Sequence, residues 1–349
     1  MAKRNVALVA GALGITGRNL VRYLDTLEQW DVVALSRRSP DFATRATFLS
    51  LDLLDQQACK TALRAVRGIT HVFFCAYSPG VDEFASVQIN LRLLTNLVES
   101  LELHALARLV LVEGAKWYGA HLGPYRTPAK EADPRHLPPN FYYDQEDYVR
   151  ARATEDGWTW AAVRPSGICG FSSGNPMNLS TALAVYCVIS KELGLPLRFP
   201  GKPGAFRAVC EMTDATHLAR ALVWSATDER CTNEAFNITN GDYIRWQNIW
   251  PAIAACFDMT AEGVQTISLS TYMADKADLW QRIVAKYDLQ PYRLEEIAAW
   301  PFLDAILGIE YDIMSDTVKA RESGFADVVD TTKMFSRIFA EFRSDRIIP

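Results

Sequence analysis

The sequence VALVAGALGITG at residues 6–17 joins an apolar run to three evenly spaced glycines, Gly11, Gly14 and Gly17. The apolar run predicts a buried strand, and the residues after the glycines predict a helix. Glycines here permit a tight turn and let a ligand approach the backbone, while the N–H groups at the start of the helix attract an anion. A strand, a glycine turn and a helix in this order are typical of a dinucleotide-binding site, although a glycine-rich turn without a ligand would have the same sequence.

Apolar runs and amphipathic stretches alternate from this site as far as residue 164. Continuous apolar strands separated by helices indicate a parallel sheet with helices on both faces. We therefore predict an α/β fold of the doubly wound Rossmann type. The expected strands are residues 6–9, 31–35, 46–51, 71–75, 108–112 and 160–164, and the expected helices are residues 16–28, 55–66, 83–102 and 142–155.

This alternation ends at Pro165. We predict a dinucleotide-binding domain at 1–165 and, at 166–349, a mainly helical cap that binds the substrate, with a segment at about 205–240 returning to the sheet. Within the cap we expect loops at 165–177 and 196–212, helices at 178–193, 245–257 and 276–286, and a strand at 234–238.

Composition excludes several classes of protein. The 349 residues carry a net charge of −5, so no basic surplus points to nucleic acid or to an anionic membrane. No run of 18 apolar residues occurs, and the glycines interrupt the apolar N-terminal run, so we expect neither a membrane span nor a secretion signal. Seven cysteines without paired spacing favour a reducing compartment, and we expect a cytoplasmic protein. The five histidines have no metal-site spacing, so we expect no metal.

The end of the second expected strand indicates which dinucleotide binds. An acidic residue there usually binds a free ribose 2′-hydroxyl, whereas this chain has Ser36, Arg37 and Arg38. Two guanidinium groups suit a 2′-phosphate, so we predict NADPH rather than NADH. Asp52 and Leu53 end the third strand, where they could meet the adenine ring; an acid in that position is also a common helix cap.

The usual catalytic pair of short-chain dehydrogenases, a Tyr with a Lys four residues later, is missing. Glu146 and Asp147 stand four residues after Tyr142 and Tyr143. A Lys at 116, just beyond the fifth strand, lies at the edge where open α/β sheets bind ligands and could take the place of the missing one.

These features together identify a family resemblance. The chain resembles the progesterone 5β-reductase/iridoid synthase-like group of atypical short-chain dehydrogenases, and the most specific elements are the displaced Lys116 and the Phe-Tyr-Tyr-x-x-Glu-Asp run. Further similar stretches are residues 11–17, 36–38, 113–118, 140–147, 164–171, 233–241, 280–289 and 300–308. Plant members usually have His after the Lys, whereas this chain has Trp117, which implies a reshaped pocket.

The resemblance implies that Lys116 and Tyr142 are catalytic and that the cofactor is NADPH. Together with the glycines and Ser36, the cofactor contacts would be Leu13, Gly14, Ile15, Arg37, Arg38, Asp52, Leu53, Ala76, Val112, Lys116, Tyr142, Ile168, Asn175, Pro176 and Met177.

The implied reaction is 1,4-reduction of an α,β-unsaturated carbonyl compound. The partner would be a small hydrophobic enone or enal, and a homodimer is possible. Tyr142 would stabilise the enolate oxygen and Lys116 would hold the ribose. Two alternatives stay open: a carbonyl reductase or sugar-modifying short-chain dehydrogenase, and a catalytically silent NADPH-binding sensor.

Overall fold

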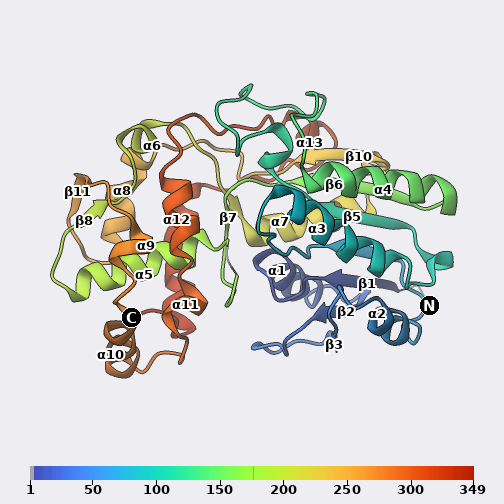
Figure 1. The fold of residues 1–349 in the computed structure, drawn as a ribbon, viewed down its shortest axis with the longest axis horizontal. Helices are drawn as coiled ribbons and strands as arrows, with labels where there is room; N and C mark the ends of the chain where they lie inside the picture. The colour runs from blue at the N-terminus through green and yellow to red at the C-terminus, as the bar shows by residue number, and fades with distance from the viewer. Residues whose placement is uncertain (1–3, 176) are drawn as a thin grey trace. The chain divides into compact units, whose positions relative to one another are not determined.

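The computed structural model describes residues 4–175 and 177–349. Within these residues a seven-stranded sheet, with all its strands parallel, forms the centre of the N-terminal part of the protein (Figure 1). Its strands are β1 (Asn5–Ala10), β2 (Trp30–Ser36), β3 (Thr47–Ser50), β4 (His71–Phe74), β5 (Arg108–Val112), β6 (Thr159–Arg164) and β10 (Glu234–Asn237).

The strand order is β10-β6-β5-β4-β1-β2-β3. β1 lies in the interior of the sheet, between β2 and β4, where Val9 is in register with Ala34 of β2 and with Phe73 of β4. The chain order therefore reverses at β1, which is the position where doubly wound sheets bind ligands at their carboxyl ends. This topology confirms the predicted Rossmann-type fold.

Helices cover this sheet and share its apolar core. The buried core includes Leu8 of β1, Val72 of β4 and Leu109 of β5, packed with helix residues Leu94 and Val149. Such continuous burial of the strands explains their unbroken apolar sequence. The helices are α1 (Ile15–Leu24), α2 (Gln56–Leu63), α3 (Glu83–Val98), α4 (Phe141–Asp156), α7 (Ala215–Thr227) and α13 (Val318–Glu322).

The chain divides into two compact units. The first unit contains Met1–Ser166, Thr216–Ile238 and Asp316–Ala326, and so includes β10, α13 and nearly all of α7. The second contains Gly167–Ala215, Thr239–Ser315 and Asp327–Pro349. Within the described residues its elements are β7 (Ile168–Cys169), α5 (Leu179–Glu192), β8 (Leu197–Phe199), α6 (Pro203–Arg207), β9 (Thr213–Asp214), α8 (Trp246–Ala255), β11 (Ala261–Val264), α9 (Leu269–Tyr272), α10 (Ala277–Tyr287), α11 (Leu294–Ile297), α12 (Trp300–Leu307) and α14 (Thr331–Ser344).

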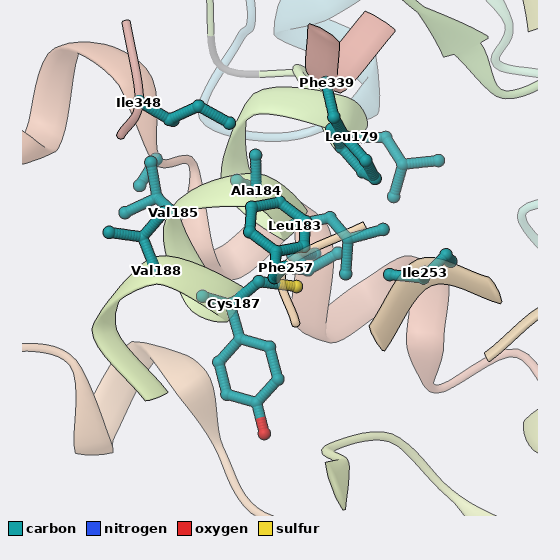
Figure 2. Close-up of a cluster of buried hydrophobic side chains, with 14 of the residues drawn as sticks. Leu179, Leu183, Ala184, Val185, Cys187, Val188, Ile253, Phe257, Phe339 and Ile348 are labelled. Carbon is teal, nitrogen blue, oxygen red and sulfur yellow. The ribbon is translucent and has the colours of Figure 1, made fainter. Parts of the chain in front are cut away.

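The second unit is built around α5, whose residues 179–190 are all buried. Figure 2 shows Leu183 and Cys187 of this helix among Ile253, Phe257 and Phe339, which come from or closely follow α8 and α14. A helix that is apolar on every side is stable only when other elements surround it. The segment 196–212, expected to be a loop, instead contains β8 and α6; the proline at the start of α6 is compatible with a helix because a first-turn N–H needs no partner in the helix.

Candidate functional site

The turn after β1 requires glycine at two positions. Gly11 has φ +79°, and a Cβ added to it would lie 2.7 Å from the carbonyl oxygen of Cys75 and 2.8 Å from Cα of Ala76. A Cβ added to Gly17 would collide with the backbone of Gly11. The glycines therefore let the turn pack directly against the segment that follows β4.

The first turn of α1 offers backbone N–H groups to an anion. Gly14 is the N-cap and has no side chain to satisfy them, and the first intrahelical bond runs from the N–H of Arg18 to the carbonyl of Gly14 (2.9 Å). The N–H groups of residues 15–17 precede that bond, and there is no acidic side chain among these residues. This end of α1 is therefore suited to a phosphate group.

The side chains of Leu13 and Ile15 are buried, and the backbone of the turn is fixed by a bond from the N–H of Ala12 to the carbonyl of Leu35 (3.0 Å). These apolar side chains face the protein interior. Any contact that the two residues make with a cofactor would come chiefly from their backbone.

The expected 2′-phosphate residues lie together at the carboxyl end of β2. Ser36 is half-buried, and its hydroxyl accepts a hydrogen bond from the N–H of Arg38 (3.2 Å). Arg37 and Arg38 are both exposed. The carbonyl of Arg37 accepts a bond from the hydroxyl of Ser50 (3.4 Å), which links this corner to the end of β3.

The neighbouring strands bring Asp52, Leu53 and Val112 to the same edge of the sheet. Asp52 is exposed and its carboxylate accepts the N–H of Leu54 (3.0 Å), so it stabilises a local turn. Leu53 is buried, and its carbonyl accepts a bond from the Asn96 amide (2.8 Å). Val112 is the last residue of β5 and is half-buried.

Lys116 lies on the short 3-10 helix η2 (Ala115–Tyr118), which follows β5. Its amine forms an ion pair with Glu83 at the start of α3 and lies 5.2 Å from the centre of the Phe141 ring. The carbonyl of Lys116 accepts a bond from the side chain of Asn140 (2.9 Å), the N-cap of α4. These contacts join the Lys116 segment to the helix that carries the two tyrosines.

The two tyrosines differ in what their hydroxyl groups bind. The Tyr143 hydroxyl donates to the carbonyl of Trp117 (2.6 Å) and accepts the N–H of His136 (2.7 Å). The Tyr142 hydroxyl has no hydrogen-bond partner among the described residues and lies beside Gly114, where an added Cβ would be 3.2 Å from its oxygen. Tyr142 can therefore offer its O–H to a ligand, whereas the Tyr143 hydroxyl is used in hydrogen bonds within the protein.

Burial raises the pKa of Tyr142 well above its usual value, and the nearby Glu113 and Tyr77 raise it further. The phenol therefore keeps its proton at neutral pH. A neutral phenol serves as a hydrogen-bond donor to an oxygen on which negative charge develops.

A buried cluster beside Tyr142 was not expected from the sequence. The Arg164 guanidinium binds Glu113 (2.7 Å), Glu146 (3.0 Å) and the hydroxyl of Tyr118 (3.2 Å), and its Cζ lies 3.7 Å from the centre of the Trp117 ring. The indole N–H of Trp117 donates to Glu146 (3.2 Å). Trp117, expected to reshape the pocket, is thus buried in this cluster.

The other expected cofactor residues belong to the second unit. Ile168 lies in β7, and Met177 is partly exposed with its N–H bonded to the side chain of Asn175 (2.9 Å). Pro176 lies outside the described residues. Contacts from these four residues to the cofactor remain predictions.

Two further properties concern the described residues alone. No helix among them is long and apolar enough to cross a membrane. They also contain no group of three His, Cys, Asp or Glu side chains that could hold a metal ion.

Comparison with known proteins shows which family the chain resembles over nearly its whole length. A family model described as a PRISE-like Rossmann-fold domain matches residues 7–349. The (S)-8-oxocitronellyl enol synthase of Catharanthus roseus is 31% identical over 99% of this chain and 93% of the relative. The short chain dehydrogenase gsfE of Penicillium aethiopicum is 31% identical over 98% of this chain and 99% of the relative.

Solved structures share the fold at low sequence identity. A UDP-glucose 4-epimerase from Thermotoga maritima has a TM-score of 0.70 and 17% identity, and the match covers 97% of this chain and 99% of that one. A Thermus thermophilus UDP-glucose 4-epimerase in complex with NAD has a TM-score of 0.69 and 18% identity, with the same coverage.

Proposed function

The chain belongs to the PRISE-like Rossmann-fold family, and from this premise we propose that it is an oxidoreductase that uses NADPH for the 1,4-reduction of an α,β-unsaturated carbonyl compound. The observation that carries the proposal is the Tyr142 hydroxyl, which has no partner among the described residues and lies beside Gly114 at the carboxyl edge of the sheet. A relative named as an enol synthase supports a reaction that passes through an enol or enolate.

The residues of the first unit fit NADPH. The glycine turn and the free N–H groups of residues 15–17 at the start of α1 would bind the pyrophosphate. Arg37 and Arg38 would bind the 2′-phosphate, and Lys116 would hold the nicotinamide ribose. When bound, NADPH supplies the hydride that reaches the β-carbon of the substrate.

Tyr142 would stabilise the charge that develops on the carbonyl oxygen. Its protonated phenol donates a hydrogen bond whose strength grows as that oxygen becomes an enolate. The α-carbon then takes its proton from solvent, so Tyr142 need not lose its own. Lys116 is paired with Glu83 in this structure, so binding of the ribose by Lys116 would require it to exchange that partner.

The test compares NADPH oxidation with 2-cyclohexen-1-one and with cyclohexanone, with NADH in parallel assays. Turnover of the enone alone, faster with NADPH, is the expected result. Turnover of the ketone would replace the proposal with an ordinary carbonyl reductase. Tight NADPH binding without turnover of a wider panel of enones and enals would favour the sensor alternative.

A further inference from the structure

Glu113 is a buried carboxylic acid with too few partners for its charge. It follows the last residue of β5, and its side chain is 1% exposed. One oxygen, Oε2, accepts from Nε of Arg164 (2.7 Å), whereas the other, Oε1, is buried without a hydrogen-bond partner among the described residues. A desolvated carboxylate oxygen without a donor is costly, so this site favours the neutral acid.

The charges around Glu113 favour the same form. Its one cationic partner, Arg164, also binds Glu146 (3.0 Å). Glu146 also forms ion pairs with Arg150 (3.1 Å) and Arg135 (3.6 Å). Two carboxyl groups therefore share Arg164, and Glu113 has fewer other hydrogen-bond donors around it than Glu146 has. Burial raises the pKa of Glu113 to about 7; Arg164 lowers it by a smaller amount, and the nearby Glu146 adds to the rise.

Glu113 also lies next to the reacting group. Gly114, the residue after it, is the one whose added Cβ would lie 3.2 Å from the Tyr142 hydroxyl. Burial raises the pKa of Tyr142 most, and a negative charge on Glu113 raises it further. The titratable and charged groups that face Glu113 are Arg164 from β6, Glu146 and Tyr142 from α4, Tyr118 from η2 and Arg135 from the loop before α4.

Resting on the function proposed above, we propose that Glu113 is a positioning residue that switches Tyr142 between two strengths as a hydrogen-bond donor. With its proton, Glu113 is neutral, and Tyr142 can donate strongly to the enolate oxygen. When Glu113 has lost its proton, its buried negative charge near Tyr142 opposes the growth of a second negative charge on the substrate. The proton stays on Glu113 throughout the reaction and is not transferred to the substrate.

The first test needs no activity. In protein labelled with carbon-13 at the glutamate carboxyl and tyrosine Cζ positions, NMR follows both residues against pH, with signals assigned by Glu113→Gln and Tyr142→Phe. The Glu113 carboxyl is expected to titrate near pH 7. The Tyr142 signal should shift with the same midpoint, and that shift should vanish in Glu113→Gln. If Glu113→Gln does not fold, Glu113→Asp assigns the signal instead, because it also removes that labelled glutamate, and the two midpoints in the unmodified protein then decide the matter.

The second test uses the enone assay. In the unmodified protein kcat should fall about tenfold as pH rises through the Glu113 midpoint, since the negative charge that Glu113 gains opposes the charge that develops on the enolate oxygen. Glu113→Gln should keep the high rate across that range. The matched control is Glu131→Gln, a half-buried acid of the same unit that binds the N–H of Asn237 (2.7 Å) and should leave the pH profile unchanged.

The outcomes separate the two proposals. Either of two results would overturn the switch, whether or not the protein reduces enones. In the first, Glu113 titrates with a midpoint below about pH 5; in the second, the Tyr142 signal does not change as Glu113 titrates. A coupled titration without enone turnover supports the switch as a property of this pair and contradicts only the proposed reaction.

Discussion

Two adjacent tyrosines begin α4, and their hydroxyl groups have opposite surroundings. Tyr143 is satisfied by the carbonyl of Trp117 and the N–H of His136, so it fixes the loop and η2 to the helix. Tyr142 has a hydroxyl with no such bonds and a raised pKa. The pair therefore offers a matched comparison, because the same Tyr→Phe change removes the proposed hydrogen-bond donor to the substrate at one position and structural hydrogen bonds at the other.

We expect Tyr142→Phe to lower kcat for the enone at least about 100-fold with nearly unchanged NADPH affinity, since it removes a donor to the developing oxyanion. Tyr143→Phe should lower the free energy of unfolding by about 1–2 kcal/mol, since it removes one buried and one partly buried hydrogen bond, and should change kcat less. Steady-state kinetics, NADPH fluorescence titration and urea denaturation measure the three quantities. Near-normal turnover by Tyr142→Phe would contradict the assigned role.

The arginines at the end of β2 are the residues that we propose to determine the cofactor preference. Replacing Arg37 and Arg38 together by Ala should raise KM for NADPH at least about tenfold and change KM for NADH little, because only NADPH has the 2′-phosphate that the guanidinium groups would bind. Both side chains are exposed, so their loss should leave the unfolding midpoint almost unchanged. An equal rise in KM for both cofactors would rule out the assignment.

Residue identity alone points to part of the proposed site. Lys116 and Tyr142 stand out because the expected lysine is missing four residues after the tyrosine and another follows β5. The Arg164 cluster gives no such signal: its members come from β5, η2, α4 and β6, and each is unremarkable within its own segment. The cluster exists only because parallel pairing of β5 with β6 brings Glu113 and Arg164 together.

At the scale of elements, the first turn of α4 connects both expected catalytic residues. Asn140 caps this helix by accepting the N–H of Tyr142 (3.1 Å), and its amide donates to the carbonyl of Lys116 (2.9 Å). Its side chain is buried, unlike that of Asp55, the N-cap of α2, which accepts the N–H of Ala58 (2.9 Å). One cap is therefore part of the site, and the other supports only its own helix.

Asn140→Ala and Asp55→Ala should each cost about 1 kcal/mol of unfolding free energy, the usual effect of losing an N-cap. Asn140→Ala should in addition lower kcat/KM for the enone about tenfold, because the Lys116 segment loses its tether to α4. Urea denaturation and steady-state kinetics distinguish the two effects. If both variants lost activity equally, the connection between Asn140 and Lys116 would have no catalytic role.

Elements with strong periodicity were predicted closely, and short ones were not. The expected strand at 108–112 matches β5 residue for residue, because its apolar run is bounded by polar residues. The segments 203–207 and 215–227 form α6 and α7, which the sequence analysis did not predict. Tertiary packing stabilises such helices more than their own sequence does.

At the scale of the whole molecule, the first unit is assembled from three separate stretches of chain. Asn237 of β10 joins them and is completely buried. Its amide donates to the carbonyls of Ala129 (3.0 Å) and Asp316 (3.1 Å), and its side-chain oxygen accepts the Tyr118 hydroxyl (2.6 Å). The return of residues 316–326 to this unit was not predicted, because such long-range bonds leave no periodic pattern in the sequence.

Asn237→Ala should therefore destabilise the protein by about 3 kcal/mol, since two carbonyls and a hydroxyl in the interior lose a partner and a cavity remains. The matched control is Asn19→Ala, in which the lost amide binds only the carbonyl of Ile15 in its own helix (2.8 Å) and the cost should stay below about 1 kcal/mol. Urea denaturation followed by tryptophan fluorescence measures both. Because the three stretches meet at Asn237, its loss should also expose the 316–326 segment to amide hydrogen exchange before the rest of the sheet. Equal losses of stability in the two variants, with unchanged exchange at 316–326, would show that the stretches are held together elsewhere.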